Sequence, residues 1–198
     1  LQRHGVLDRS YWSYCEGRTE HDSIDECPLE LDTLDLRHSA EQFVDLAPYL
    51  ADDFTQDQRN DHHLLAEHLY RDAYCSIVTE TMFDWDQSGG TLLSEKTFKP
   101  IKHGQLFFIA GGVGSLQCLR DLGYRTFDSV LDNSYDLETD NTQRWIKLRS
   151  AIVDAQRQGI DQLFEAARGD IEYNQQLFLS SKHERVSSLL RKIHDKSC

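Results

Sequence analysis

The chain has 198 residues, of which 39% are hydrophobic and 28% are charged, and its formal net charge is −13. This length and composition predict a folded domain with its own core and a wet surface. Nucleic acids and anionic membrane surfaces select clustered Lys and Arg, whereas the basic residues here are scattered, so we expect neither partner. No apolar run in the sequence reaches membrane-spanning length.

The cysteines are few and widely separated: Cys15, Cys27, Cys75, Cys118 and Cys198. Their odd number and the lack of a CxxC pair indicate free thiols in a reducing compartment, which predicts a cytoplasmic location. Because the chain begins at Leu1 without a Met, we expect it to be part of a longer protein with a further domain upstream.

Short elements alternate along the first two thirds of the chain. The patterns predict a strand over 10–15, helices over 39–46 and 61–70, and a buried strand over 74–80. A helix capped by Ser94 then runs to about His103, although Pro100 requires it to be short or kinked.

The apolar run 106–110 predicts a second buried strand, which ends at a Gly-rich loop over 111–114. A helix capped by Ser115 follows, with Leu116, Leu119 and Leu122 turned inward and Gly123 at its C-cap, and 124–127 reads as another strand. This alternation predicts a Rossmann-like parallel sheet flanked by helices over residues 1–139.

The last segment, 140–198, reads as a helical extension that packs on this domain. Three apolar stripes indicate three helices. They comprise Trp145, Leu148 and Ile152; then Ile171, Leu177 and Phe178; then Val186, Leu189, Leu190 and Ile193.

The start of the 94–103 helix is the first candidate site. A helix N-terminus attracts phosphate groups through its free N–H groups and its dipole. Lys96 and Lys99 would add positive charge for a diphosphate, and Glu95 can accept hydrogen bonds from a ribose diol. Ser94 could equally be an ordinary cap, with Glu95 complementing the dipole and Lys96 solvated.

The second candidate is the loop 111–115, where Gly112 and Gly114 could let a phosphate approach the backbone. The loop is neither a Walker A motif nor GxGxxG, and its glycines could simply permit a tight turn. Glu80 ends the strand over 74–80, where it either lies buried with partners, facing the same edge as Glu95, or stays exposed beyond the strand end.

No metal site is expected. His62, His63 and His68 lack the spacing of a helical zinc pair, and Asp84 and Asp86 are read as an ordinary polar loop.

A family resemblance strengthens the first candidate. The stretch 76–81, followed after a loop by 92–101, resembles the donor-binding region of GT-B glycosyltransferases and is similar to the α1,3-fucosyltransferase pattern in which a "FENS" strand precedes a "YVTEK" helix start. Residues 78–127 are also similar to a string of motifs in bacterial and phage glycosyltransferase-like proteins.

The resemblance implies an inverting, metal-independent transfer from a nucleotide diphosphate sugar to a hydroxyl acceptor such as a glycan, with no further cofactor. It implies that Glu95 contacts the ribose and Lys96 the diphosphate, with Thr79 and Glu80 nearby. Ser94 replaces the family's Thr, Leu92 its Tyr, and Glu80 matches the "FENS" Glu only after a one-residue shift. The catalytic base is not identified.

Two other functions stay open. The chain could be a nucleotide-binding module without transferase activity, or an interaction protein whose helical extension over 140–198 assembles with partners.

Overall fold

A computed structural model describes residues 1, 5–11, 67–81, 83 and 93–194, with side chains described as far as Ser181. The predictions for the strand beyond Tyr11, the helix over 39–46, the first part of the 61–70 helix, and the positions of His62, His63, Asp84 and Asp86 lie outside the described residues. So do the side chains of the third apolar stripe.

Two parallel strands form the centre of the described fold, as predicted. Strand β1 (Cys75–Thr79) pairs with β2 (Leu106–Ala110), with Cys75 opposite Leu106 and Thr79 opposite Ala110. Helix α4 (Glu95–His103) lies in the connection between the strands, so this part of the chain forms a strand–helix–strand unit.

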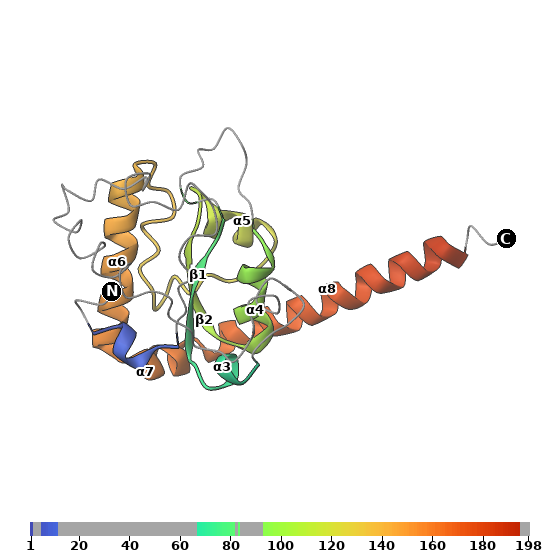
Figure 1. Cartoon of the computed structure of the whole chain (residues 1–198). Coiled ribbons are helices and arrows are strands. Elements are labelled where there is room, and N and C mark those ends of the chain that lie inside the picture. The colour runs from blue at the N-terminus through green and yellow to red at the C-terminus, as the bar shows by residue number, and fades with distance from the viewer. Residues whose placement is uncertain (2–4, 12–66, 82, 84–92, 195–198) are drawn as a thin grey trace, which may run out of the picture.

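Strand β2 is buried along its whole length because helices cover both faces of the sheet. Figure 1 shows α6 (Asn141–Gln158) on one side of the strands and α4 on the other. All five β2 side chains are buried, and Phe107 meets Phe127 edge-on at 4.9 Å between ring centroids. A strand enclosed in this way reads as a continuous apolar run.

Helix α4 begins and ends where the sequence predicts. The Ser94 hydroxyl accepts a hydrogen bond from the Lys96 amide at the start, and Gly104 ends the helix in the left-handed conformation with φ +68°. Pro100 lies inside this nine-residue helix.

Helix α5 (Ser115–Asp121) differs from its prediction at both ends. The N-cap is Gly114 with φ +80°, and Ser115 is the first helical residue. At the other end Leu122 is the C-cap and is 51% exposed, so its predicted inward orientation is wrong. Gly123, which was predicted as the C-cap, lies one position after the observed C-cap and has φ +91°.

Residues 124–127 are not a strand. Both backbone groups of Arg125 bond the side-chain amide of Asn174, at 2.8 Å each, so a side chain takes the place of a neighbouring strand. Phe127 then turns the chain with φ +62°.

Three helices follow Asp140, as the helical prediction requires, but with different boundaries. They are α6, α7 (Ile160–Ala166) and α8 (Arg168–His194). The second and third predicted helices are one continuous helix, α8, and α7 was missed. Leu148, Ile152 and Ile171 are buried in the same core as β2.

The remaining described elements are short. They are the 3-10 helix η2 (Leu7–Arg9) and helix α3 (Glu67–Arg71). Helix α8 crosses α4 and then extends away from the rest of the fold (Figure 1). Among the helices described, none combines the length and the apolar character needed to cross a lipid bilayer.

Candidate functional site

The carboxyl ends of β1 and β2 bring the two predicted junctions together. A Cβ added at Gly111 would lie 2.8 Å from the Ser115 hydroxyl and 3.4 Å from Cβ of Glu80. The loop after β2 therefore packs directly against Glu80, the residue that follows β1. Ligands of parallel sheets bind at this kind of edge.

Glu80 is buried, 7% exposed, and it has partners on α4. Its carboxylate accepts hydrogen bonds from the Ser94 amide at 3.0 Å, the Ser94 hydroxyl at 2.6 Å and the Thr97 hydroxyl at 2.6 Å. The buried alternative for Glu80 is thus the observed one. Glu80 joins the end of β1 to the first turn of α4.

The backbone amides at the start of α4 already have acceptors. The Ser94 amide bonds Glu80, the Lys96 amide bonds the Ser94 hydroxyl at 3.2 Å, and the Thr97 amide bonds the Ser94 carbonyl at 3.2 Å. A phosphate could reach the Ser94, Lys96 or Thr97 amide only by displacing its present acceptor. The Glu95 carboxylate, 44% exposed, lies beside this helix start.

Glu95 and Lys96 lie at the surface of this helix start. Their charged groups are 3.4 Å apart, and both side chains are about two-fifths exposed, at 44% and 43%. Burial raises the pKa of the Glu95 carboxyl, but the bond from its own amide and the charges of Lys96 and Lys99 outweigh burial and hold that pKa below its ordinary value. Glu95 is therefore an anion at neutral pH, able to accept hydrogen bonds.

A second buried acidic residue, Asp136, forms hydrogen bonds with the end of the Gly-rich loop and with the start of α5. Asp136 accepts hydrogen bonds from the Leu116 amide at 2.7 Å and the Gln117 amide at 3.0 Å, while its carbonyl accepts one from the Gly114 amide at 2.8 Å. The carbonyl of Gly112 accepts from the Ser115 hydroxyl at 2.7 Å. Asp136 thus holds the place that a phosphate would take at the start of α5.

Burial raises the pKa of the Asp136 carboxyl above its ordinary value, against the opposing effect of the two amide bonds. Arg120 lies 3.8 Å from this carboxylate and bonds Asp128 at 2.8 Å. Sequence reasoning missed Asp136. The signal was weak, because a cap normally lies next to its helix in sequence, whereas Asp136 lies twenty residues after Leu116, whose amide it accepts.

Thr79 pairs with Ala110 at the end of β1, and its side chain is exposed. Of the other predicted site residues, Glu80 is buried, Glu95 is exposed, and the rest are half-buried, namely Ser94, Lys96, Lys99, Gly112 and Gly114. Glu95 and Lys99 also line a pocket. Across the described ranges no three His, Cys, Asp or Glu side chains come together as a metal-binding group.

Two of the pockets on the described surface are large enough to hold a small ligand. One, of about 360 Å³, is lined by Glu95, Phe98, Lys99, Lys102, Leu122, Tyr124, Leu177, Phe178 and Ser181. It lies beside the candidate site because Glu95 and Lys99 belong to both.

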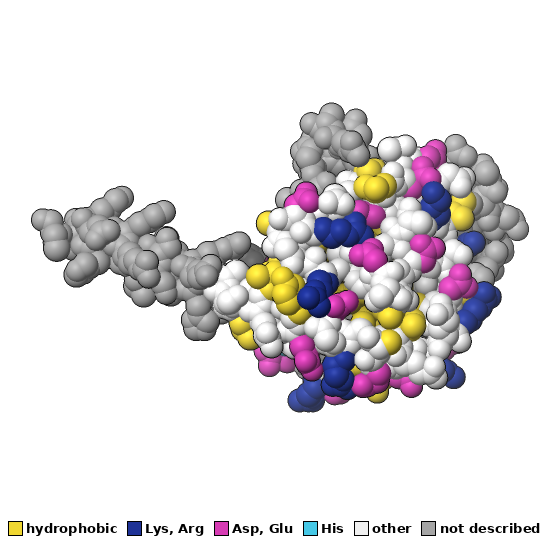
Figure 2. All heavy atoms as spheres, turned by 180° about the vertical axis from the view of Figure 1, so that it is seen from behind, with side chains coloured by type: hydrophobic (Ala, Val, Ile, Leu, Met, Phe, Trp, Pro, Cys, Tyr) yellow, Lys and Arg dark blue, Asp and Glu magenta, His cyan; other side chains and the backbone are white. Residues whose placement is uncertain are grey.

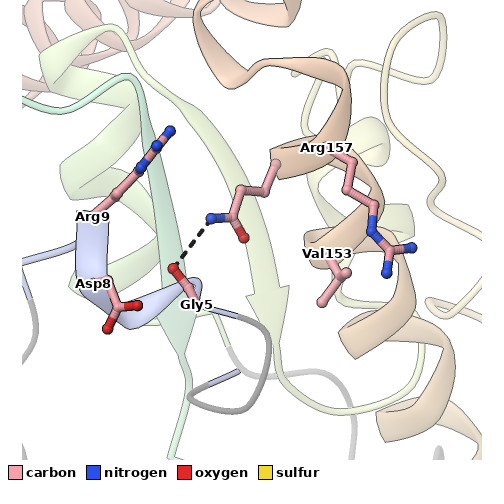
Figure 3. Close-up of a pocket in the computed structure, with 6 residues that line it drawn as sticks. Gly5, Asp8, Arg9, Val153 and Arg157 are labelled. Carbon is pink, nitrogen blue, oxygen red and sulfur yellow. Dashed lines mark hydrogen bonds between the residues drawn. The ribbon is translucent and has the colours of Figure 1, made fainter.

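The other pocket, of about 380 Å³, lies between the N-terminal segment and α6. Gln156 donates a 3.2 Å hydrogen bond to the Gly5 carbonyl there, and Arg9 and Arg157 extend in different directions rather than toward one point (Figure 3). The two guanidinium groups therefore do not converge on a common ligand.

Comparison with protein-family models, curated proteins and solved structures gives no match to this chain.

Proposed function

We propose that this chain is the donor-binding portion of an inverting, metal-independent glycosyltransferase, with a Rossmann-like domain of GT-B type. The observation that carries the proposal is the pairing of an exposed carboxylate, Glu95, with an exposed ammonium, Lys96, at the start of α4. A carboxylate suits a ribose diol and an ammonium suits a diphosphate. The motif resemblance around residues 78–127 is the second support, and the cysteine pattern supports a reducing, cytoplasmic location.

The hydrogen bonds at the start of α4 reduce the number of residues that we propose to contact the nucleotide sugar. Ser94 and Glu80 bond each other, so their role in the proposal is to fix the first turn of α4. Thr79, Gly112 and Gly114 would shape the sheet edge. Glu95, Lys96 and Lys99 remain as the groups that a nucleotide sugar would contact.

In the proposed reaction the oxygen of an acceptor hydroxyl attacks the anomeric carbon of the sugar. The bond from that carbon to the diphosphate oxygen breaks, and the nucleoside diphosphate leaves with the electron pair. Lys96 and the α4 dipole would stabilise the charge that develops on the leaving diphosphate. The hydroxyl proton requires a base, and we assign that role to none of the described residues.

A melting-temperature panel tests the proposal. The full chain is heated with GDP, UDP or ADP, with CMP as the monophosphate control. A ligand at 100 times its Kd should stabilise the fold by about 2.7 kcal/mol. We expect one diphosphate to raise the melting temperature, and we expect Glu95→Ala and Lys96→Ala each to abolish the rise.

The matched control is another exposed ion pair, Glu165 and Arg168, which lies on α7 and α8. Glu165→Ala and Arg168→Ala should keep the full ligand-induced rise. Absence of a rise with every diphosphate, or an equal loss in the control variants, would contradict the proposed site.

The second candidate function is a protein-interaction module, and α8 favours it. This helix extends beyond the rest of the fold (Figure 1), and its residue Leu179 is 53% exposed. Light scattering after size exclusion tests it. If the wild type self-assembles and Leu179→Lys weakens the assembly, this function is favoured. If the wild type and Leu179→Lys are both monomers, the result argues against self-assembly.

A further inference from the structure

The pocket between α4, α8 and the turn after α5 has a different chemistry from the helix start. Its floor is aromatic. Phe98 stacks on Phe178 with 6.3 Å between ring centroids and 25° between planes, and Tyr124 meets Phe98 edge-on at 6.0 Å. Leu122 and Leu177 complete an apolar wall. Rings at these distances and angles pack well against a further flat ring.

Charged groups of both signs lie on the rim, with positive charge in excess. Residues 95, 98, 99 and 102 recur at the spacing of one helix face, so Lys99 and Lys102 flank the aromatic floor on the same side as Glu95. Lys102 has an exposed partner in Glu67 at 3.6 Å, and within the described residues no carboxylate lies within 4 Å of the Lys99 ammonium.

Lys99 and Lys102 line the same pocket although the chain as a whole has a net charge of −13. On the face shown in Figure 2, hydrophobic side chains gather beside basic and acidic ones near the point where α8 leaves the body of the molecule. The volume, about 360 Å³, is within the usual range of small-ligand pockets.

We propose that this pocket binds a planar aromatic group that carries one negative charge, such as an aromatic carboxylate. The ring lies on Phe98 and Phe178, and the anion lies between Lys99 and Lys102. Leu122 would close over the ring, which explains why a leucine at a helix C-cap is half-exposed here rather than packed in the core.

This pocket proposal does not rest on the proposed glycosyltransferase function. The two proposals assign opposite effects to Glu95, so substitutions of Glu95 distinguish them. In nucleotide binding the Glu95 carboxylate is required. Toward an aromatic anion in the pocket the same carboxylate is repulsive, because it has the same charge and lies on the rim.

The test is calorimetric titration of the full chain with 2-naphthoate and with its neutral analogue 2-naphthalenemethanol, both at millimolar concentration. We expect the wild type to bind naphthoate more tightly. The variant Lys99→Gln with Lys102→Gln removes both charges and keeps polar side chains that are one atom shorter. It should weaken naphthoate by about tenfold or more and leave the neutral analogue unchanged.

Two further variants make the result specific. Glu95→Gln should tighten naphthoate, and Leu122→Ser, at a position that is 51% exposed, should weaken both compounds. Arg157→Gln on α6, which lies outside this pocket, should change neither. The proposal is overturned if naphthoate fails to bind the wild type, or if it binds the lysine double variant as tightly as the wild type.

Discussion

The Glu80 carboxylate and the Ser94 hydroxyl, fourteen residues apart, lie 2.6 Å from each other at the junction of β1 and α4. Both were predicted to lie beside a nucleotide, and in the structure each has the other as a hydrogen-bond partner. The bond fixes where α4 begins relative to the sheet, and with it the positions of Glu95 and Lys96. The exposed charges of the proposed donor site thus depend on a buried polar contact behind them.

Replacing Glu80 by Gln should lower the free energy of unfolding by roughly 1–3 kcal/mol. The amide keeps the shape of the side chain but offers one oxygen to three donors, so at least one donor near Ser94 or Thr97 loses its acceptor. Urea unfolding followed by circular dichroism measures the change. Glu165→Gln, an exposed site on α7, is the control and should change stability little. Equal stability of Glu80→Gln and the wild type would mean that Glu80 does not hold α4 in place.

Replacing Asp136 by Ala should also cost roughly 1–3 kcal/mol at neutral pH, because the Leu116 and Gln117 amides then lose the side chain that accepts their hydrogen bonds. The pH dependence gives a second readout. Burial raises the pKa of Asp136, so the folded state favours the protonated form. The stability contributed by this group therefore falls as pH rises from the ordinary pKa toward the raised one. Denaturant melts across the acidic range should show this slope in the wild type and not in Asp136→Ala. An identical slope in both proteins would rule out Asp136 as its source.

Gly104 and Gly169 provide a matched pair of glycine substitutions. Gly104 ends α4 with φ +68°, and a Cβ there would lie 2.7 Å from the Gln175 side chain, so Gly104→Ala should destabilise the protein by about 1 kcal/mol or more. Gly169 lies in the first turn of α8 with nothing within 4 Å of an added Cβ. Gly169→Ala should stabilise by about 0.4–1 kcal/mol. Thermal melts of the two variants check both signs, and a stabilising Gly104→Ala would contradict the observed helix end.

The thiol of Cys75 should resist alkylation while the protein is folded. Burial raises the pKa of Cys75 to about 12, so the reactive thiolate is scarce at neutral pH. Pulse labelling with N-ethylmaleimide, followed by peptide mass spectrometry, measures each cysteine separately. We expect Cys75 to label far more slowly in the folded protein than in urea. Equal labelling rates in the two states would contradict the protection that the fold gives to this half-buried thiol.

The sequence predicted the parts of the fold that local patterns determine. The apolar run of β2, the strand over 74–80 and the Ser94 cap each produce a signal within a few neighbouring residues, and all three are confirmed. The predictions for 124–127 and for α8 were wrong because distant contacts decide them. Asn174 takes the place of a strand beside Arg125, and no sequence pattern near Arg125 reveals it.

The same distinction applies to the candidate site. A carboxylate at the end of β1 was predictable from position, but its bonds to Ser94 and Thr97 depend on how the intervening loop returns α4 to the sheet. Asp136 was unpredictable for the same reason, since Leu116, whose amide it accepts, precedes it by twenty residues. Whether Glu95 and Lys96 hold a nucleotide stays a prediction.

The most direct measurement compares nucleotide affinity in Glu95→Gln and Glu80→Gln by calorimetric titration with the diphosphate that stabilises the wild type. We expect Glu95→Gln to lose affinity while the melting temperature of the free protein stays near that of the wild type. For Glu80→Gln we expect reduced stability of the free protein as the main effect. Wild-type affinity in Glu95→Gln would contradict the proposed donor site at the start of α4.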